Sequence, residues 1–241
     1  HKHNNPCGVA IRDSLTEAFN DSLASDNISA FGGILTTNKI VDENTANQIN
    51  ELFFEILIAP DFEYEAFKVL KSKKNRILIK LKKIPKERIQ RRTCLNGELE
   101  QDYDDKTETF NDFKVVTNIS PDKNNSDDLV LASIIAKHTK SNCIIITKNQ
   151  QLIGSGMGQV SRIDALNQAI NKSKKFGFNL DGASLASDAF FPFSDCVEIS
   201  FKNGIKSIIQ PGGSVRDTDS IEFCNQNKMS MMFSGIRHFK H

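Results

Sequence analysis

The sequence predicts an α/β protein of two lobes, and three observations support this fold class. Segments with apolar residues at helical spacing alternate with short runs that are apolar throughout, the pattern of strands covered by helices on both faces. The order helix, strand, helix, strand requires crossover connections and a layered parallel sheet. The 241 residues exceed the usual size of one domain, and a polar, acidic stretch interrupts the alternation. We therefore expect lobes at residues 1–110 and 111–241.

The first lobe opens with Leu15, Ala18, Phe19 and Leu23 at helical spacing, which predicts a helix at 13–25. The apolar run at 28–35 contains two adjacent glycines and indicates a strand with a close backbone approach. The same reasoning predicts a helix at 44–54, a strand at 56–59, a helix at 63–72 and a strand at 77–79.

Charged residues gather near the end of the first lobe. Twelve of residues 68–92 are Lys or Arg, while 98–108 is acidic and is expected to be a loop. A single-stranded nucleic-acid site would interleave aromatic side chains to stack the bases, and the basic stretch has none. We therefore expect a solvated helix face and a connector.

The second lobe repeats the alternation without an exact sequence repeat. A helix is expected at 127–140, with Ser126 or Asp127 as its N-cap. A strand at 143–147, a turn at 148–150, a strand ending at 154 and a helix from about residue 160 follow. The later elements are an apolar, Phe-rich stretch at 184–193, a helix at 195–202, a strand at 205–209, a turn at 211–214, a helix at 217–227 and a strand at 229–233.

Composition excludes several classes of protein. With 31 Lys and Arg against 30 Asp and Glu, the formal charge is +1, so neither nucleic acid nor an anionic membrane is expected as the main partner. No apolar run approaches the roughly 20 residues that a transmembrane helix needs. The five cysteines form no CxxC pair and have no histidine at zinc-finger spacing. They indicate reduced thiols and a cytoplasmic protein.

The chain opens on a dense group of polar side chains. His1, Lys2 and His3 are followed by two amides and a Pro6-Cys7-Gly8 turn. A histidine near neutrality can move a proton and a neighbouring lysine can stabilise negative charge, as acyl transfer to a weak nucleophile requires. His1 alone is also compatible with a tag remnant. No second cysteine follows Pro6-Cys7 at the required spacing and no His-x-Glu occurs, so zinc-dependent deaminase chemistry is not expected.

Two glycine-rich segments are candidates for binding. Residues 153–159 lie between a predicted strand and a helix, where backbone N–H groups can approach an anion, although the spacing does not fit a dinucleotide fingerprint. Gln159 and Arg162 would be the polar side chains of such a substrate loop. Residues 211–214 are a second loop of this kind or a bare turn.

Aromatic residues mark two further candidates. Residues 187–195 place three Phe rings around a proline between two carboxylates, which fits either a core strand or an aromatic pocket with an acceptor at its mouth. Residues 235–241 are basic and aromatic, and form either a binding segment or a frayed tail.

Together, seven motifs in this order resemble the transformylase part of the bifunctional purine biosynthesis protein family. That family combines a transformylase for aminoimidazole carboxamide ribotide (AICAR) with an IMP cyclohydrolase. The motifs are Lys2-His3-x-x-Pro6-x-Gly8, Ser29-x-Phe31-Gly32, Ile58-Ala59-Pro60, Thr139-x-Ser141-Asn142, Gly156-x-Gly158-Gln159-x-Ser161-Arg162, Ser187-Asp188-Ala189-Phe190-Phe191-Pro192-Phe193 and Arg237-x-Phe239-x-His241. The resemblance implies two cytidine-deaminase-like three-layer lobes without zinc, the first incomplete at its N-terminus.

The same resemblance implies an activity, formyl transfer from 10-formyltetrahydrofolate to the 5-amino group of AICAR in IMP biosynthesis. The cyclohydrolase domain is not expected in this chain, and low activity is expected from this part alone. A non-catalytic remnant that binds AICAR or folate is the alternative. The family pattern further implies a homodimer with shared active sites, and leaves room for a monovalent cation such as potassium.

Site residues are carried over position by position from this resemblance. Catalysis is expected from Lys2, His3 and Asn142. The AICAR ligands are expected to be Glu55, Asp195, Arg237, Phe190 and Phe193, together with Gln159 and Arg162 of the candidate substrate loop described above. The folate is expected to pass Ile28, Asn142 and Pro192. No metal-ligating side chain is expected.

Overall fold

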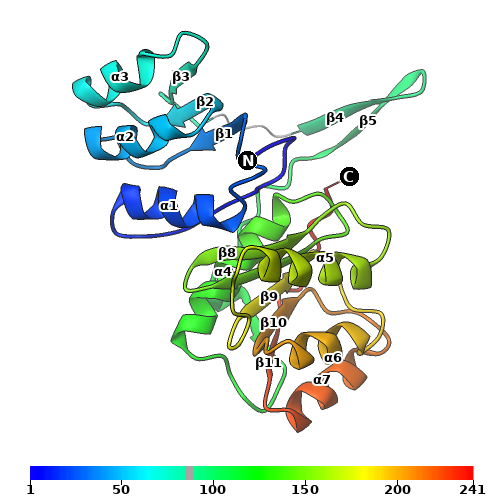
Figure 1. Cartoon of the computed structure of the whole chain (residues 1–241). Helices are drawn as coiled ribbons and strands as arrows, with labels where there is room; N and C mark the ends of the chain where they lie inside the picture. Colours follow the sequence, from blue (N-terminus) through cyan, green and yellow to red (C-terminus); the bar gives the residue numbers. More distant parts are fainter. Residues whose placement is uncertain (85–88, 241) are drawn as a thin grey trace.

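The computed structural model describes residues 1–84 and 89–240 and contains a three-stranded sheet, a two-stranded ribbon and a six-stranded sheet (Figure 1). The strands of the two larger sheets alternate with helices that cover them, which confirms the α/β class. Residues 85–88 of the expected basic connector lie outside the described residues.

The three-stranded sheet is parallel, in the order β1-β2-β3. Its part of the chain runs through α1 (Leu15–Ser25), β1 (Gly33–Thr36), α2 (Glu43–Glu51), β2 (Phe54–Ala59), α3 (Tyr64–Lys71) and β3 (Ile77–Lys80). The expected alternation is confirmed, but β1 is shorter than predicted. Residues 27–32 form turns that place Gly32 against Phe53, and the strand begins at Gly33.

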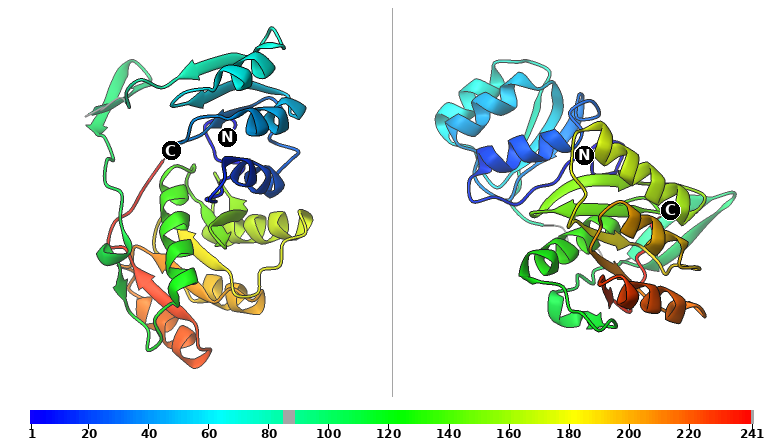
Figure 2. Two further views of the ribbon diagram at one scale, coloured as in Figure 1. Left: turned by 90° about the vertical axis from the view of Figure 1, so that its left-hand side faces the viewer. Right: turned by 60° about the horizontal axis from the view of Figure 1, so that its bottom comes forward.

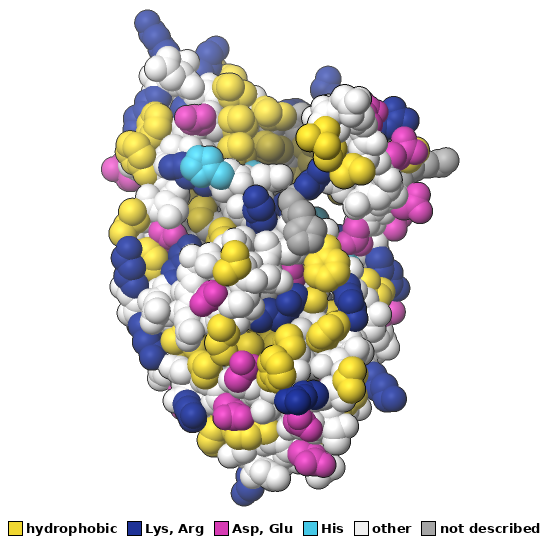
Figure 3. All heavy atoms as spheres, turned by 90° about the vertical axis from the view of Figure 1, so that its right-hand side faces the viewer, with side chains coloured by type: hydrophobic (Ala, Val, Ile, Leu, Met, Phe, Trp, Pro, Cys, Tyr) yellow, Lys and Arg dark blue, Asp and Glu magenta, His cyan; other side chains and the backbone are white. Residues whose placement is uncertain are grey.

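One face of this sheet is covered and the other is open. Leu35, Leu57 and Leu78 pack with α1, α2 and α3 in one apolar cluster. The opposite face carries two cross-strand rows, Ile34–Ile56–Ile77 and Thr36–Ile58–Ile79, because paired residues point to the same side. Ile77 is 54% exposed and Ile79 39%. Figure 3 shows hydrophobic side chains gathered over this lobe. Parallel sheets are normally covered on both faces, so this face is available for packing.

The acidic stretch is a loop only at 103–108, and its first part is a strand, contrary to the sequence prediction. Strands β4 (Ile89–Cys94) and β5 (Gly97–Asp102) form an antiparallel ribbon that projects from the body of the protein (Figure 1). Cross-strand pairing sets Arg91 opposite Glu100, with Nε and Oε2 2.8 Å apart. The basic and acidic segments therefore pair with each other, which composition alone does not show.

The six-stranded sheet has the order β6-β11-β10-β9-β7-β8 and helices on both faces. Its elements after the short helix η1 (Phe110–Asp112) are β6 (Lys114–Val115), α4 (Lys123–Lys137), β7 (Ile144–Lys148), β8 (Gln151–Gly156), α5 (Arg162–Lys175), β9 (Ser184–Ser187), α6 (Asp195–Lys202), β10 (Ser207–Gln210), α7 (Asp217–Gln226) and β11 (Ser230–Phe233). Ile145 packs with α4, whereas Ile144 and Ile146 pack with the clusters of α5, α6 and α7. The six-stranded sheet is thus the middle of three layers.

Helix α4 begins four residues before the predicted start. Its N-cap is Asp122, whose carboxylate accepts from the Asn125 N–H, and neither Ser126 nor Asp127 caps it. The other predicted helices of this lobe lie within about two residues of their expected bounds. Among the helices of the described residues, none has the length and hydropathy needed to cross a bilayer.

Candidate active site

Most of the predicted second-lobe site residues lie at one edge of the six-stranded sheet. Strands β9, β10 and β11 are parallel, so their C-terminal ends meet there. Because β7 runs antiparallel to β9, its beginning lies at the same edge. Asn142, Asp188, the 211–214 turn and Arg237 thus come from loops at one edge, the position at which open α/β sheets bind ligands.

A buried carboxylate stands at the centre of this edge. Asp188 is 2% exposed, and its Oδ1 accepts from Arg162 Nη2 at 3.1 Å and from the Cys143 N–H at 3.3 Å. Arg162 Nε also donates to Ser187 Oγ at 3.2 Å. The second oxygen, Asp188 Oδ2, has no hydrogen-bond partner among the described residues. Arg162 therefore lies inside the loop framework, and one oxygen of Asp188 can accept a further ligand.

The C-terminal segment places Arg237 over an aromatic ring. Its guanidinium lies 4.5 Å from the centre of Phe190, and a side chain at Gly213 would come within 3.5 Å of Nη2. Arg216 lies in the same way 5.0 Å from Phe193. Pro192, Phe193 and Asp195 are exposed, on the loop before α6 and at its first residue.

The 211–214 segment is a turn whose donors are already used. The backbone N–H groups of Gly213 and Ser214 both donate to Asp217 Oδ2, at 2.7 and 3.1 Å. This favours the bare turn over an anion-binding loop.

The glycines of the 153–159 segment also have a packing role. A Cβ on Gly156 would lie 1.8 Å from the Ala165 carbonyl oxygen, and one on Gly154 would meet the Ala169 carbonyl oxygen at 2.6 Å. These two glycines let α5 pack closely on β8. Only Gly158, with φ of 65°, lies in the loop.

Asn142 and Gln159 are held together beside that loop. Their backbones exchange two hydrogen bonds of 3.3 Å, and Asn142 Nδ2 donates to the Gln159 carbonyl at 2.9 Å. Gln159 Nε2 donates to the Met157 carbonyl at 3.0 Å. Gln159 thus fixes Asn142, whose amide oxygen makes no hydrogen bond within residues 1–84 and 89–240.

In the first lobe, Lys2 and His3 lie on a tight turn. Lys2 and Asn5 exchange both backbone hydrogen bonds, and the residues between them, His3 and Asn4, have φ of 50° and 61°. Lys2 Nζ donates to the Phe31 carbonyl at 2.7 Å, which joins two of the sequence motifs. The His3 imidazole is exposed and makes no hydrogen bond in the described part of the chain. Uncommon backbone conformations of this kind gather at functional sites.

This turn contacts the edge of the second lobe. Asn5 Oδ1 accepts from the Lys140 N–H at 2.9 Å, and Lys240 Nζ donates to the Asn4 and His138 carbonyls at 3.0 and 2.8 Å. Figure 2 (left) shows the N-terminus and the C-terminal segment side by side. Lys2 and His3 therefore lie beside the loop that carries Asn142.

A buried ion pair joins the lobes at a second place. Asp26 Oδ2 lies 2.7 Å from Lys172 Nζ of α5. Burial alone would raise the pKa of Asp26, but hydrogen bonds from Lys172 and Ser29 outweigh it and lower that pKa. The docking of the lobes thus includes a charged, 4% exposed aspartate.

Two predicted ligands lie apart from the second-lobe edge. Glu55 is an exposed residue at the start of β2, and Ile28 is 62% exposed in the turns before β1. Both belong to the first lobe with Lys2, and the structure gives neither a contact to Asn142 or Arg237. The structure also shows a set that sequence reasoning missed, buried His238 and Glu108 with half-exposed Asp104. Its members are separated by up to 134 residues, so no local pattern marks them.

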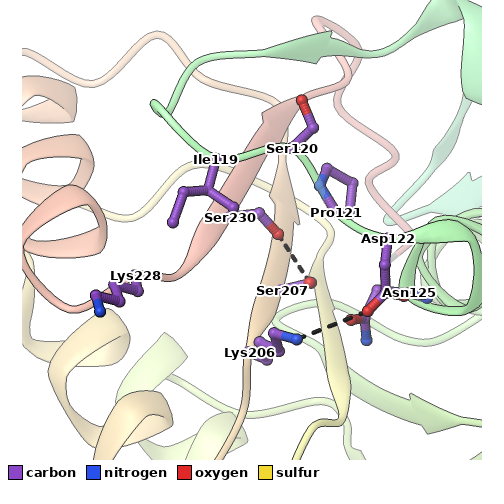
Figure 4. Close-up of a pocket in the computed structure, with 9 residues that line it drawn as sticks. All are labelled: Ile119, Ser120, Pro121, Asp122, Asn125, Lys206, Ser207, Lys228 and Ser230. Carbon is purple, nitrogen blue, oxygen red and sulfur yellow. Dashed lines mark hydrogen bonds and ion pairs between the residues drawn. The ribbon is translucent and has the colours of Figure 1, made fainter.

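A cavity of about 250 Å³ lies at the opposite edge of the six-stranded sheet (Figure 4). Lys206, Ser207 and Ser230 at the N-terminal ends of β10 and β11 line it. Ser207 and Ser230 hydrogen-bond to each other at 2.8 Å, and Lys206 Nζ lies 3.6 Å from Asp122 Oδ2. These polar groups already have partners, and none of the expected site residues is among them.

Comparison with known proteins identifies the family. The model of the family described as "AICARFT/IMPCHase bienzyme" matches residues 1–172. A bifunctional purine biosynthesis protein PurH from Bacteroides thetaiotaomicron is 52% identical over 242 residues, and one from Aquifex aeolicus is 46% identical over 240. Each alignment covers 100% of this chain but 47% of the relative, so the chain spans about half the length of these proteins.

Similarity to solved structures is weak. A diaminohydroxyphosphoribosylaminopyrimidine deaminase/5-amino-6-(5-phosphoribosylamino)uracil reductase from Thermotoga maritima matches 44% of this chain and 34% of its own, with 19% identity and a TM-score of 0.32. A similarity of that size carries no argument about fold or function.

Proposed function

Because the chain belongs to the AICARFT/IMPCHase bienzyme family, we propose that it is the part of such an enzyme that transfers a formyl group from 10-formyltetrahydrofolate to the 5-amino group of AICAR. The observation that carries this proposal is the contact between the Lys2-His3 turn and the edge that holds Asn142 and Arg237. Through Asn4 and Asn5, the turn that carries an imidazole and an ammonium contacts the loops that carry the Asn142 amide and the Arg237 guanidinium. Acyl transfer to a nucleotide amine needs these groups together.

The reaction requires help at the amine. The 5-amino group of AICAR is conjugated into an imidazole with a carboxamide, so it is a poor nucleophile and must be aligned and deprotonated as the bond forms. In our proposal His3 accepts that proton. Lys2 and Asn142 stabilise the oxyanion that develops on the formyl group and assist departure of the folate nitrogen.

The nucleotide is placed by the aromatic region of the second lobe. Arg237 offers charge-assisted hydrogen bonds to the phosphate, and Phe190 and Phe193 provide apolar walls. Asp195 and Glu55 are exposed acceptors for the polar end of AICAR. Gln159 and Arg162 act through Asn142 and Asp188, which they hold in place. Ile28, Asn142 and Pro192 would border the folate.

The residues around Asp188 fit a monovalent cation. Oδ2 of this buried carboxylate has no partner in the described part of the chain, and Thr139 and Ser141 on the neighbouring loop are also buried. A potassium-sized ion takes oxygen donors, and would bind at Oδ2, since Arg162 already pairs with Oδ1. We propose this role as structural.

The proposal includes a homodimer in which a second copy completes the active site. In the chain alone, the open isoleucine face of the first lobe also favours association, because a contiguous apolar face favours burial. We also propose that the chain does not carry the cyclohydrolase activity of its relatives.

The replacement His3→Ala tests the proposed base. We expect turnover to fall by about 10²- to 10⁴-fold while AICAR affinity stays within roughly tenfold, because a general base contributes to rate more than to ground-state binding. Formyl transfer is measured in an assay with both substrates, and binding by calorimetry. His1→Ala is the matched control, because His1 contacts β1 through its backbone.

Unchanged turnover in His3→Ala would remove this residue from the mechanism. If the unaltered chain binds AICAR or the folate and never transfers the formyl group, the chain is a binding remnant.

A further inference from the structure

A histidine close to Arg237 is held between two carboxylates. His238 is 5% exposed, with Nδ1 2.6 Å from Asp104 Oδ2 and Nε2 2.8 Å from Glu108 Oε1. Lys137, itself 9% exposed, has its Nζ 3.5 Å from Asp104 Oδ1. Glu108 is 3% exposed, whereas the side chain of Asp104 is 40% exposed, so the contact with Glu108 is the one shielded from water.

Two short contacts to carboxylates favour an imidazole that is protonated on both nitrogens. A neutral imidazole has one N–H and one lone pair, so it can donate to only one of two ionised carboxylates. At the other contact, the lone pair of the ring nitrogen would point at a lone pair of the carboxylate oxygen. An unsatisfied polar contact of this kind is costly when it is buried. With both nitrogens protonated, His238 and Lys137 supply two positive charges against the two negative charges of Asp104 and Glu108.

The network ties three distant segments together at the candidate site. Asp104 and Glu108 lie on the connector after β5, Lys137 ends α4, and His238 belongs to the C-terminal segment. The backbone N–H of His238 also donates to the Asp188 carbonyl at 3.3 Å. Arg237 is the preceding residue, and is itself exposed. Its backbone therefore takes its position from the anchored neighbour.

We propose that His238, doubly protonated between Asp104 and Glu108, is a positioning residue that fixes Arg237 for the phosphate of the nucleotide. This inference rests on the function proposed above. His238 does not touch the ligand. It sets where the preceding guanidinium stands over Phe190, so its loss affects phosphate-bearing ligands selectively.

The first experiment tests the charge without any ligand. Long-range ¹H–¹⁵N spectra of ¹⁵N-histidine-labelled chain report whether each ring nitrogen carries a proton, and the signal that is absent in His238→Gln identifies His238. We expect both nitrogens to be protonated at pH 7.5. A neutral His238 in the folded chain would overturn the proposal, whatever the chain binds.

The second experiment tests the positioning by calorimetry with AICAR and with its riboside, which lacks the phosphate. In His238→Ala we expect AICAR to bind about tenfold or more weakly, the scale of a lost charge-assisted hydrogen bond, with less than twofold change for the riboside. Lys206→Met is the control, because it removes an ion pair at the opposite edge of the sheet. Equal weakening of both ligands, or an unchanged AICAR affinity, would overturn the proposal.

If the unaltered chain does not bind AICAR at all, the proposed function fails. The spectra of His238 still show, without any ligand, whether both of its ring nitrogens are protonated.

Discussion

Arg237 illustrates how a residue in an exposed segment can still be fixed. Phe190 lies under its guanidinium, Gly213 leaves the space beside it, and the next residue is anchored by a buried network. A side chain held this way loses less conformational entropy when it binds an anion. The sequence of residues 235–241 alone is equally compatible with a frayed tail.

Replacing Arg237 should separate phosphate recognition from ring recognition. We expect Arg237→Ala to weaken AICAR far more than its riboside, and Arg237→Lys to recover only part of the loss, because an ammonium lacks the paired donors of a guanidinium. Calorimetry with the two ligands measures both effects. Arg216→Ala, which removes the similar stack on Phe193, is the comparison. Equal losses for AICAR and riboside would show that Arg237 does not bind the phosphate.

We expect the buried cysteines to react more slowly with thiol reagents than the exposed ones. Burial raises the pKa of Cys196 and Cys224 to about 12, and that of Cys143 well above its ordinary value. Since the thiolate is the nucleophile, a disulfide reagent at pH 8 should modify exposed Cys94 first and half-buried Cys7 next. The other three should react only on unfolding. Fast modification of all five in the folded chain would contradict this.

The raised pKa values of Cys196 and Cys224 also make the free energy of unfolding depend on pH. A buried thiol whose pKa is raised by folding stabilises the folded state fully at pH values below the pKa of the unfolded chain, near 9. This contribution to the free energy of unfolding is lost as pH rises toward the pKa of the folded chain, about 12. Alkaline destabilisation should therefore begin above about pH 9.

At the scale of elements, the sequence predicted periodic segments well and their exact ends less well. Helix α6 has its predicted bounds, and its buried residues Cys196, Val197 and Ser200 lie at helical spacing. Helix α4 starts earlier because Asp122 can bond the Asn125 N–H, and two later candidates compete for the same role in the sequence. The β4–β5 ribbon was missed since its strands are exposed on both faces and show no apolar alternation.

The candidate site was predictable only in part, for a physical reason. Motif resemblance brought Lys2, Asn142 and Arg237 together in one expectation, and the structure joins their segments through Asn5, Lys140 and Lys240. The network of His238 depends on tertiary folding of three segments, which no spacing rule encodes. The glycines at 154 and 156 look like a ligand loop in sequence, whereas their contacts are with α5.

Gly156 provides a test of that packing role. In Gly156→Ala the new Cβ would collide with the Ala165 carbonyl, so α5 must shift from β8, and we expect a loss of about 2 kcal/mol or more in unfolding free energy, typical of overpacking. Gly177→Ala is the matched control. It has positive φ but no atom within 4 Å of the added Cβ, and should cost about 1 kcal/mol through strain. Denaturant titration measures both. Similar losses in the two variants would contradict a packing role for Gly156.

At the scale of the whole molecule, the two sheets differ in how they are covered. Helix α4 lies on one face of the six-stranded sheet, and α5, α6 and α7 lie on the other. The three-stranded sheet has helices on one face, and its isoleucine rows are open in the described structure. The backbone of His1 also exchanges two hydrogen bonds with Ile34 of β1, at 2.6 and 2.8 Å. Residues joined ahead of His1 would therefore enter beside this sheet.

This geometry predicts the effect of adding the half of a relative that the chain does not match. We expect a hybrid with that half of the Bacteroides thetaiotaomicron protein fused ahead of His1 to cover the isoleucine face. It should bind less of a hydrophobic dye, scatter light as a discrete dimer, and transfer formyl groups faster than the chain alone. Misplacement of a catalytic group by about 1 Å can lower the rate roughly 100-fold. Anchoring the Lys2-His3 turn should therefore raise the rate of formyl transfer.

The hybrid with the same half fused after the C-terminal segment is the control, because Lys240 of that segment hydrogen-bonds to Ser141 and not to the three-stranded sheet. Ile77→Thr with Ile79→Thr in the chain alone should lower dye binding in a similar way, since both replacements remain β-branched and make the face polar. If both hybrids behave alike, the open face does not set the order of the two halves. A monomeric chain with the turnover of the hybrid would contradict both the shared active site and the need for a covering partner.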